Sequence, residues 1–135
     1  MSRSSRRKQI DIGLLLIRVT VGGSMLAFHG IPKLMKGPEV WEKIGAAMSN
    51  IGIHFFTPFW GFAATMAETV GALFVILGLF LRPSAAVLAF TMLIAFISHL
   101  SKGDSLAAAS HPLELMLVLI ALVITGAGSY AIDKK

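Results

Sequence analysis

The sequence contains four long apolar runs, and each is long enough to cross a lipid bilayer. A helix that spans the hydrocarbon core needs about 20 mostly apolar residues. The runs predict membrane-spanning helices at about residues 12–31, 59–81, 83–99 and 112–128. The pattern therefore predicts an all-α fold: a single transmembrane domain over residues 1–135, an integral membrane four-helix bundle with a short interfacial helix between spans 1 and 2.

The segment between the first two spans is too polar to cross a bilayer, but it has the signals of a short helix. Pro32 is expected to end the first span, because proline has no backbone N–H. Pro38 suits a first helical turn, Gly52 suits the position after a last one, and Trp41 suits the headgroup zone. We interpret residues 38–51 as an amphipathic helix on the outer interface that acts as a lid, or else as a plain loop with one helical turn.

Composition and charge support a membrane protein. The chain is 56% hydrophobic and 14% charged, whereas soluble domains are about 25% charged. It has no cysteine, which excludes disulfides, thiolate metal sites and thiol redox chemistry. The net charge of +5 does not indicate nucleic acid, because the basic residues gather at the ends of spans.

The distribution of Lys and Arg predicts the topology. Residues 100–111 form a polar outer loop, and Arg82 with Pro83 forms a tight inner turn. With both termini cytoplasmic, four basic residues lie outside, namely Lys33, Lys36, Lys43 and Lys102. Seven lie inside, namely Arg3, Arg6, Arg7, Lys8, Arg82, Lys134 and Lys135. This excess agrees with the positive-inside rule.

The spans themselves carry ionisable residues, which are rare in hydrocarbon and usually face a protein interior. Glu68 shares a helical stripe with Gly61, Ala64 and Gly71, and small residues allow close helix approach. On the first span, the spacing of Arg18, Gly22, Met25, His29 and Lys33 places them on one face. Arg18 either faces the bundle on this stripe or extends to the headgroups.

Helix arithmetic predicts a polar layer in the outer half of the bundle. At a rise of about 1.5 Å per residue, His29 and His99 lie about 24–25 Å above the inner edge, and Glu68 and Glu114 about 20–21 Å. Side chains lean toward the N-terminus of their helix. The two histidines therefore lean toward the cytoplasmic side and the two carboxylates toward the outer side, so the four converge on one layer. Arg18, at about 9 Å, leans toward the cytoplasm and Glu68 leans away from it, so the two are not expected to pair.

Such a layer has several chemical uses. Two His and two Glu side chains can hold a divalent metal, relay protons, bind the polar head of a quinone or similar molecule, or form a structural network. No HxxxH pair is present, so the sequence predicts no metal ligands. His54 and His111 are expected to be solvated at helix ends.

Several motifs together resemble the DoxX family of small four-helix membrane proteins, especially its YqjF-type inner-membrane members. These are the first-span Arg with FHGIPKL, MAETVGALFVILGLFLR with its Glu, LIAFISHL with its His, and the closing ITGAGSYAID. The resemblance implies that Arg18, His29, Lys33, Glu68 and His99 occupy the family's polar positions. The Arg82–Pro83 turn departs from the family pattern, which usually lacks the proline.

The resemblance also implies a role. Family members are associated with quinone-linked oxidation, with quinone or catechol stress and with oxidoreductase complexes. We therefore expect a bacterial inner-membrane protein whose Arg18, His29, Lys33, Glu68, His99 and Glu114 form a polar core or a site for a quinone-like molecule. It would be the membrane subunit or anchor of an oxidoreductase system. Quinone is the candidate cofactor, the lipid bilayer and an oxidoreductase subunit are the candidate partners, and a homo-oligomer stays open. The alternatives are a non-catalytic structural or stress-response protein and a small proton-coupled transporter, and catalytic residues are not identified.

Overall fold

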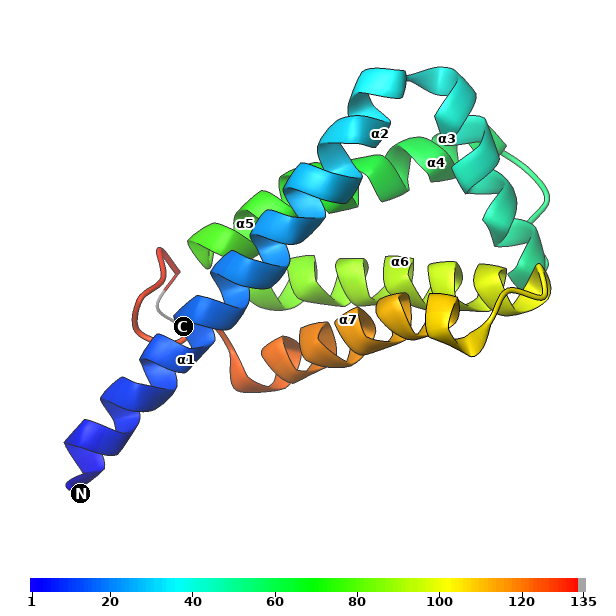
Figure 1. Cartoon of the computed structure of the whole chain (residues 1–135). Coiled ribbons are helices and arrows are strands. Elements are labelled where there is room, and N and C mark those ends of the chain that lie inside the picture. Colours follow the sequence, from blue (N-terminus) through cyan, green and yellow to red (C-terminus); the bar gives the residue numbers. More distant parts are fainter. Residues whose placement is uncertain (134–135) are drawn as a thin grey trace.

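The computed structural model describes residues 1–133, which form helices joined by short connections (Figure 1). Lys134 and Lys135, counted in the predicted inner charge, lie outside the described residues. No strand occurs in residues 1–133. Four helical stretches of this part of the chain are long and apolar enough to cross a membrane: Arg3–Lys36, Thr57–Leu77, Leu81–Ser101 and Leu106–Thr125. The prediction of an all-α membrane bundle is confirmed.

The first two spans are each interrupted by one turn of π-helix. The elements of the first span are α1 (Arg3–Met25), η1 (Leu26–Gly30, π) and α2 (Ile31–Lys36). Those of the second are α4 (Thr57–Met66), η3 (Ala67–Gly71, π) and α5 (Ala72–Leu77). Between these spans lie α3 (Pro38–Gly45) and η2 (Ala46–Ile51, 3₁₀), and after them come α6 (Leu81–Ser101) and α7 (Leu106–Thr125).

Three predicted boundaries are wrong. The inner turn is formed by residues 78–80, and Arg82 and Pro83 already lie in the first turn of α6. Pro32 does not end the first span, because the wider π turn η1 precedes it and the N–H of Ile31 bonds the Leu26 carbonyl, five residues back. A wider turn gives the proline ring room beside the preceding carbonyls. The outer loop is also shorter than predicted. Ser105 caps α7 by accepting a hydrogen bond from the Ala108 N–H, so residues 106–111 are helical and Pro112 lies inside the helix.

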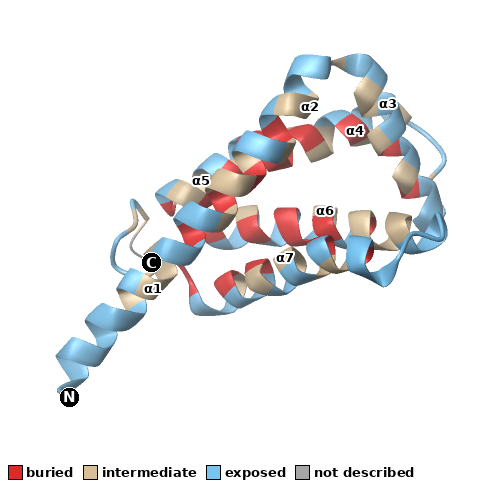
Figure 2. Ribbon diagram, viewed as in Figure 1, coloured by how far each residue is buried: buried red, intermediate tan, exposed pale blue. Residues whose placement is uncertain are grey.

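The helices pack in pairs around the buried core. α1 packs mainly against α5, α6 against α7, and α3 against α4 (Figure 1). The N-terminus and residues 126–133 lie at one end of the bundle, while α3 and η2 lie at the other, which we call the loop end. Buried residues follow the inward faces of the helices (Figure 2). Val75, Leu88, Leu119 and Met25 are fully enclosed there.

The outward faces are apolar and exposed. Leu16, Val87 and Ile124 have 62%, 54% and 73% of their surface exposed. Large exposed apolar surfaces are unfavourable in water, whereas lipid tails solvate them well. The bundle is therefore built to lie in lipid.

The short interfacial helix is held tightly against the second span. A Cβ on Gly45 of α3 would collide with the backbone of Thr57, and a Cβ on Gly61 of α4 would collide with the backbone of Trp41. The two helices thus approach backbone to backbone, which only glycine permits at both positions. The predicted helix between spans 1 and 2 is present, and its position is fixed by this contact.

We expect Gly61→Ala to lower the melting temperature strongly and to separate α3 from α4, because neither backbone can yield without moving a whole helix. Gly23→Ala is the matched control, since a Cβ there meets nothing within 4 Å and alanine favours helix by up to about 1 kcal/mol. The melting temperatures of the two variants are measured by thermal unfolding in detergent, followed by tryptophan fluorescence. Equal melting temperatures for the two variants would contradict the close approach.

Candidate functional site

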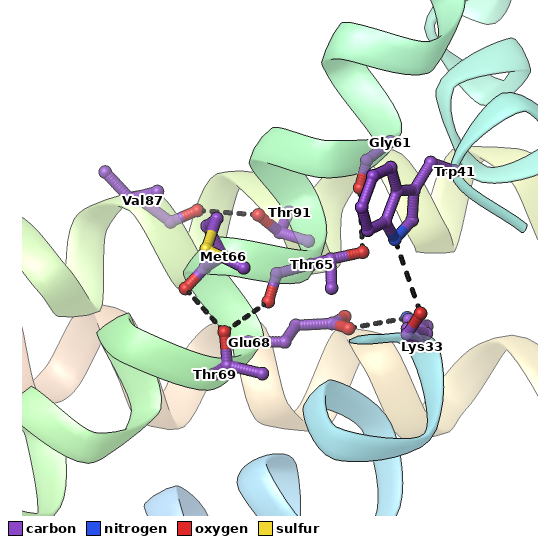
Figure 3. Close-up of polar contacts among 9 residues, drawn as sticks. All are labelled: Lys33, Trp41, Gly61, Thr65, Met66, Glu68, Thr69, Val87 and Thr91. Atoms are coloured by element: carbon purple, nitrogen blue, oxygen red, sulfur yellow. Dashed lines mark hydrogen bonds and ion pairs between the residues drawn. The ribbon is translucent and has the colours of Figure 1, made fainter. Parts of the chain in front are cut away.

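The one salt bridge between spans in residues 1–133 joins Lys33 and Glu68 (Figure 3). The Lys33 Nζ lies 2.6 Å from Glu68 Oε2, and the side chains are 27% and 2% exposed. Lys33 comes from α2 and Glu68 from the π turn η3. A carboxylate this deeply buried is stable only with a partner, and Lys33 provides the compensating charge.

The two π turns place this pair. η1 and η3 contact each other, and a Cβ on Gly30 of η1 would collide with the backbone carbonyl of Glu68. π turns are rare and often occur at functional sites, because they rotate the side chains that follow them. Here they bring the first span against the second at the level of Glu68.

The two threonine hydroxyls near Glu68 bond carbonyls of their own helix. The Thr69 hydroxyl donates to the Thr65 carbonyl at 2.8 Å and contacts the Met66 carbonyl at 3.3 Å. The Thr65 hydroxyl donates to the Gly61 carbonyl at 2.8 Å. Figure 3 shows both hydroxyls bonded along their own helix. Neither is a donor to Glu68.

One oxygen of the Glu68 carboxylate is consequently open. Lys33 bonds Oε2, and no other hydrogen bond to this carboxylate occurs in residues 1–133. No fully buried side-chain oxygen in that part of the chain lacks a partner, so Oε1 keeps a small accessible surface. Glu68 also lines a cavity, and Oε1 is the carboxylate oxygen that is not engaged by Lys33.

The cavity lies between α3 with η2, α4 with η3, and α6, and has a volume of about 490 Å³. Its walls are mostly apolar, with Met48, Ile94 and Trp60 among the lining residues. Its polar groups are few: Lys33, Lys43, Glu68, Thr91, Ser98, His99 and Lys102. An apolar cavity of this size with a few polar groups is typical of a small-molecule site.

His99 lines the same cavity from the last turn of α6. Its Nδ1 lies 2.8 Å from Asp104 Oδ2, and both side chains are about two-fifths exposed. Asp104 is located in the connection to α7, so the loop fixes the orientation of the ring. Asp104 was not predicted as a site residue; its position five residues after His99, past a turn with Gly103, is the signal that could have indicated it.

The polar layer is smaller than predicted. Glu68 and His99 line one cavity, but His29 is half-buried and stacks on His111 with ring centroids 5.8 Å apart. Glu114 is exposed, so its place in the layer is a wrong prediction. The rotation of α7 puts Pro112 and Leu119 inward, and Glu114 lies on another face. His111, expected to be solvated, is exposed but is joined to the first span by this stacking.

Arg18 is buried at the opposite end of the bundle from the cavity and does not contact Glu68, as predicted. It is 1% exposed and donates to four backbone carbonyls. These belong to Val75 and Ile76 at the end of α5, and to Ala127 and Tyr130 after α7, at 2.7–3.0 Å. Of the two sequence interpretations, the structure shows the bundle-facing one. Arg18 joins three segments and is a polar core residue far in sequence from its partners.

No group of three or more His, Asp or Glu side chains that could hold a metal ion occurs among the described residues. The cavity therefore offers hydrogen-bonding groups and charge on an apolar lining. Such a site can bind an amphipathic molecule and orient its polar head.

The four apolar spans and the buried ion pair define a polytopic α-helical membrane protein. A sequence model of the DoxX family matches residues 13–100, which cover most of the first three spans and contain Arg18, Lys33, Glu68 and His99. The chain belongs to the DoxX family. No curated protein and no solved structure matches the chain.

Proposed function

We propose that this DoxX-family protein binds a small quinone-like aromatic molecule in the cavity and is the membrane subunit or anchor of a quinone-linked or redox-stress oxidoreductase system. The single observation that carries the proposal is the cavity itself, where an apolar space of about 490 Å³ meets the Lys33–Glu68 pair. Ligand sites generally combine such a space with a few polar groups that fix orientation.

The lining suits a flat, partly polar ring. Trp60 and Phe90 offer aromatic surface, and His99 and the ion pair offer hydrogen-bonding groups. The exposed rim combines apolar Val87 and Phe90 with cationic Lys43 and Lys102. A lipid-soluble ring with polar oxygens matches this mixture better than a fully polar solute, because the apolar walls would leave a polar solute without partners.

The proposal includes a location and an orientation. We place the protein in the bacterial inner membrane with both termini cytoplasmic, on the strength of the basic residues near the termini and at Arg82. The loop end, which carries the cavity, would then face the periplasmic side. Cysteines introduced at Ser4 and at Ser101 test the orientation through labelling with an impermeant maleimide in intact cells, since the native chain has no cysteine.

The ligand proposal is tested by cavity-filling variants. Purified protein in detergent is mixed with a short-chain alkyl-1,4-benzoquinone or its hydroquinone, and the melting temperature is measured. A ligand at 100 times its Kd stabilises the fold by about 2.7 kcal/mol. We expect Ala95→Phe and Ala64→Phe, both in the cavity lining, to remove this stabilisation.

Ala86→Phe is the matched control, since Ala86 is exposed on the same helix as Ala95 and does not line the cavity. It should respond to ligand as the unmodified protein does. If neither form of the ring stabilises the unmodified protein, the ligand proposal fails. The structural alternative would then stand, with the ion pair acting to hold the spans in register.

A further inference from the structure

The polar groups that line the cavity differ in whether they can distinguish the reduced form of a ligand from its oxidised form. The lysines donate hydrogen bonds, and both a hydroxyl and a carbonyl oxygen can accept them. They therefore do not distinguish the reduced form of a quinone-like ring from the oxidised form. Only acceptors on the protein can do so, because the hydroquinone has O–H donors and the quinone has none.

Glu68 is such an acceptor. It is paired with Lys33 at 2.6 Å, and an ionised carboxylate accepts hydrogen bonds but cannot donate them. Its Oε1 has no hydrogen-bond partner among the described residues and the side chain is only 2% exposed, so a ligand group beside Oε1 would be largely shielded from water. A hydroxyl would donate to this oxygen, whereas a carbonyl would place lone pairs against it.

His99 is a second acceptor in the cavity. Asp104 bonds its Nδ1 at 2.8 Å, and an ionised carboxylate can only accept. In its neutral form the imidazole then carries its proton on Nδ1, which leaves Nε2 as an acceptor. Asp104 acts through His99 and is a positioning residue.

We propose that the cavity selects the reduced, hydroxyl-bearing form of its ring-shaped ligand over the oxidised quinone, through the open oxygen of Glu68 and through Nε2 of His99. The inference depends on the proposed function and goes further, because it assigns the redox form. Sites built to accept from a substrate hydroxyl reject the analogue that lacks it, often by large factors.

Selection of this kind has a thermodynamic consequence. The quinone takes up two electrons and two protons to give the hydroquinone. If the hydroquinone binds tenfold more tightly, the midpoint potential of the bound couple rises by about 30 mV. The bound ligand would then be a better electron acceptor than the same molecule in lipid.

Three matched probes test the inference under anaerobic conditions: an alkylhydroquinone, the corresponding benzoquinone, and the dimethyl ether of the same hydroquinone. The Kd of each is measured by tryptophan quenching, since Trp60 lines the cavity. We expect the hydroquinone to bind at least tenfold more tightly than either other probe. The ether is informative because it keeps the ring and both oxygens but has no donor.

Two variants locate the effect. In Glu68→Gln the amide offers a donor as well as an acceptor, so the hydroquinone preference should fall to about threefold or less. In Asp104→Asn the amide can donate to Nδ1 as well as accept from it, so the proton is no longer fixed on Nδ1, which should lower the preference severalfold. Asp104 is exposed, so this variant should fold even if Glu68→Gln does not. Asp104→Glu is its control and should keep the preference.

The outcomes distinguish a failure of the redox selectivity from a failure of the ligand site itself. If all three probes bind with equal Kd, or the quinone binds best, the selection is wrong while the ligand site stands. If Asp104→Asn and Glu68→Gln both keep the full preference, the acceptors assigned here are wrong. If none of the probes binds, the proposed function fails and this inference fails with it.

Discussion

Replacing Arg18 by Met is expected to be the most damaging single change in the described chain. The guanidinium satisfies four carbonyls in two segments that are far apart in sequence. Hydrogen bonds from a charged donor each contribute about 1.5–3 kcal/mol, and in lipid an unpaired carbonyl costs several more. A loss of roughly 4 kcal/mol or more is therefore expected, which would unfold a marginal bundle.

The variant should also free the segment after α7, because Ala127 and Tyr130 lose their bonds to the first span. Limited proteolysis followed by mass spectrometry should show cleavage within residues 126–133 in Arg18→Met before any other site. Arg18→Lys should restore little of the lost stability, since the compact ammonium group cannot reproduce the hydrogen bonds of the planar guanidinium to both segments. Arg82→Gln is the control, because Arg82 is exposed. Arg18→Met with an unchanged melting temperature and cleavage pattern would refute the cross-linking role.

Replacing Lys33 by Met is expected to cost about 3–5 kcal/mol, because it leaves the Glu68 carboxylate buried without its cation. The double variant Lys33→Met with Glu68→Met should regain most of that loss. An apolar pair of similar volume often replaces a buried ion pair at little or no cost. Thermal unfolding in detergent measures all three proteins.

Lys36→Met is the matched control, since Lys36 lies on the same helix and is exposed. It should change the melting temperature little. If Lys33→Met is as stable as this control, Lys33 does not compensate Glu68 in the folded protein. If the double variant is less stable than Lys33→Met alone, the two residues are not coupled in the way the ion pair requires.

The polar positions within the spans could be predicted because burying charge in lipid is costly. Arg18, Glu68 and His99 are visible as isolated ionisable residues in apolar runs, and helical spacing puts Arg18 and Lys33 on one face. The inward direction of Glu68 could be anticipated for the same reason, because it would be unstable facing lipid tails, whereas Arg18 could also have extended to the headgroups. The absence of a direct contact between Arg18 and Glu68 followed from the opposite directions in which the two side chains lean.

The partners of these residues could not be predicted in the same way. Lys33 appeared to lie past the end of the first span, because a proline normally stops a helix. The π turn η1 carries the helix beyond Pro32 and brings Lys33 to Glu68. Arg18 bonds only backbone carbonyls, and because every residue has one, residue identity does not indicate these partners. Glu114 showed the opposite error: its height was suitable, but the rotation of α7 turned it outward.

By itself, the sequence determined the four membrane crossings, the interfacial helix and the short list of residues too costly to face lipid, since hydropathy and charge are properties of each residue and its spacing. Which of those residues meet was decided only in three dimensions. Two π turns, the glycine contacts that bring backbones together and the rotation of each helix set the partners. These depend on packing between segments distant in the chain, which no local pattern records.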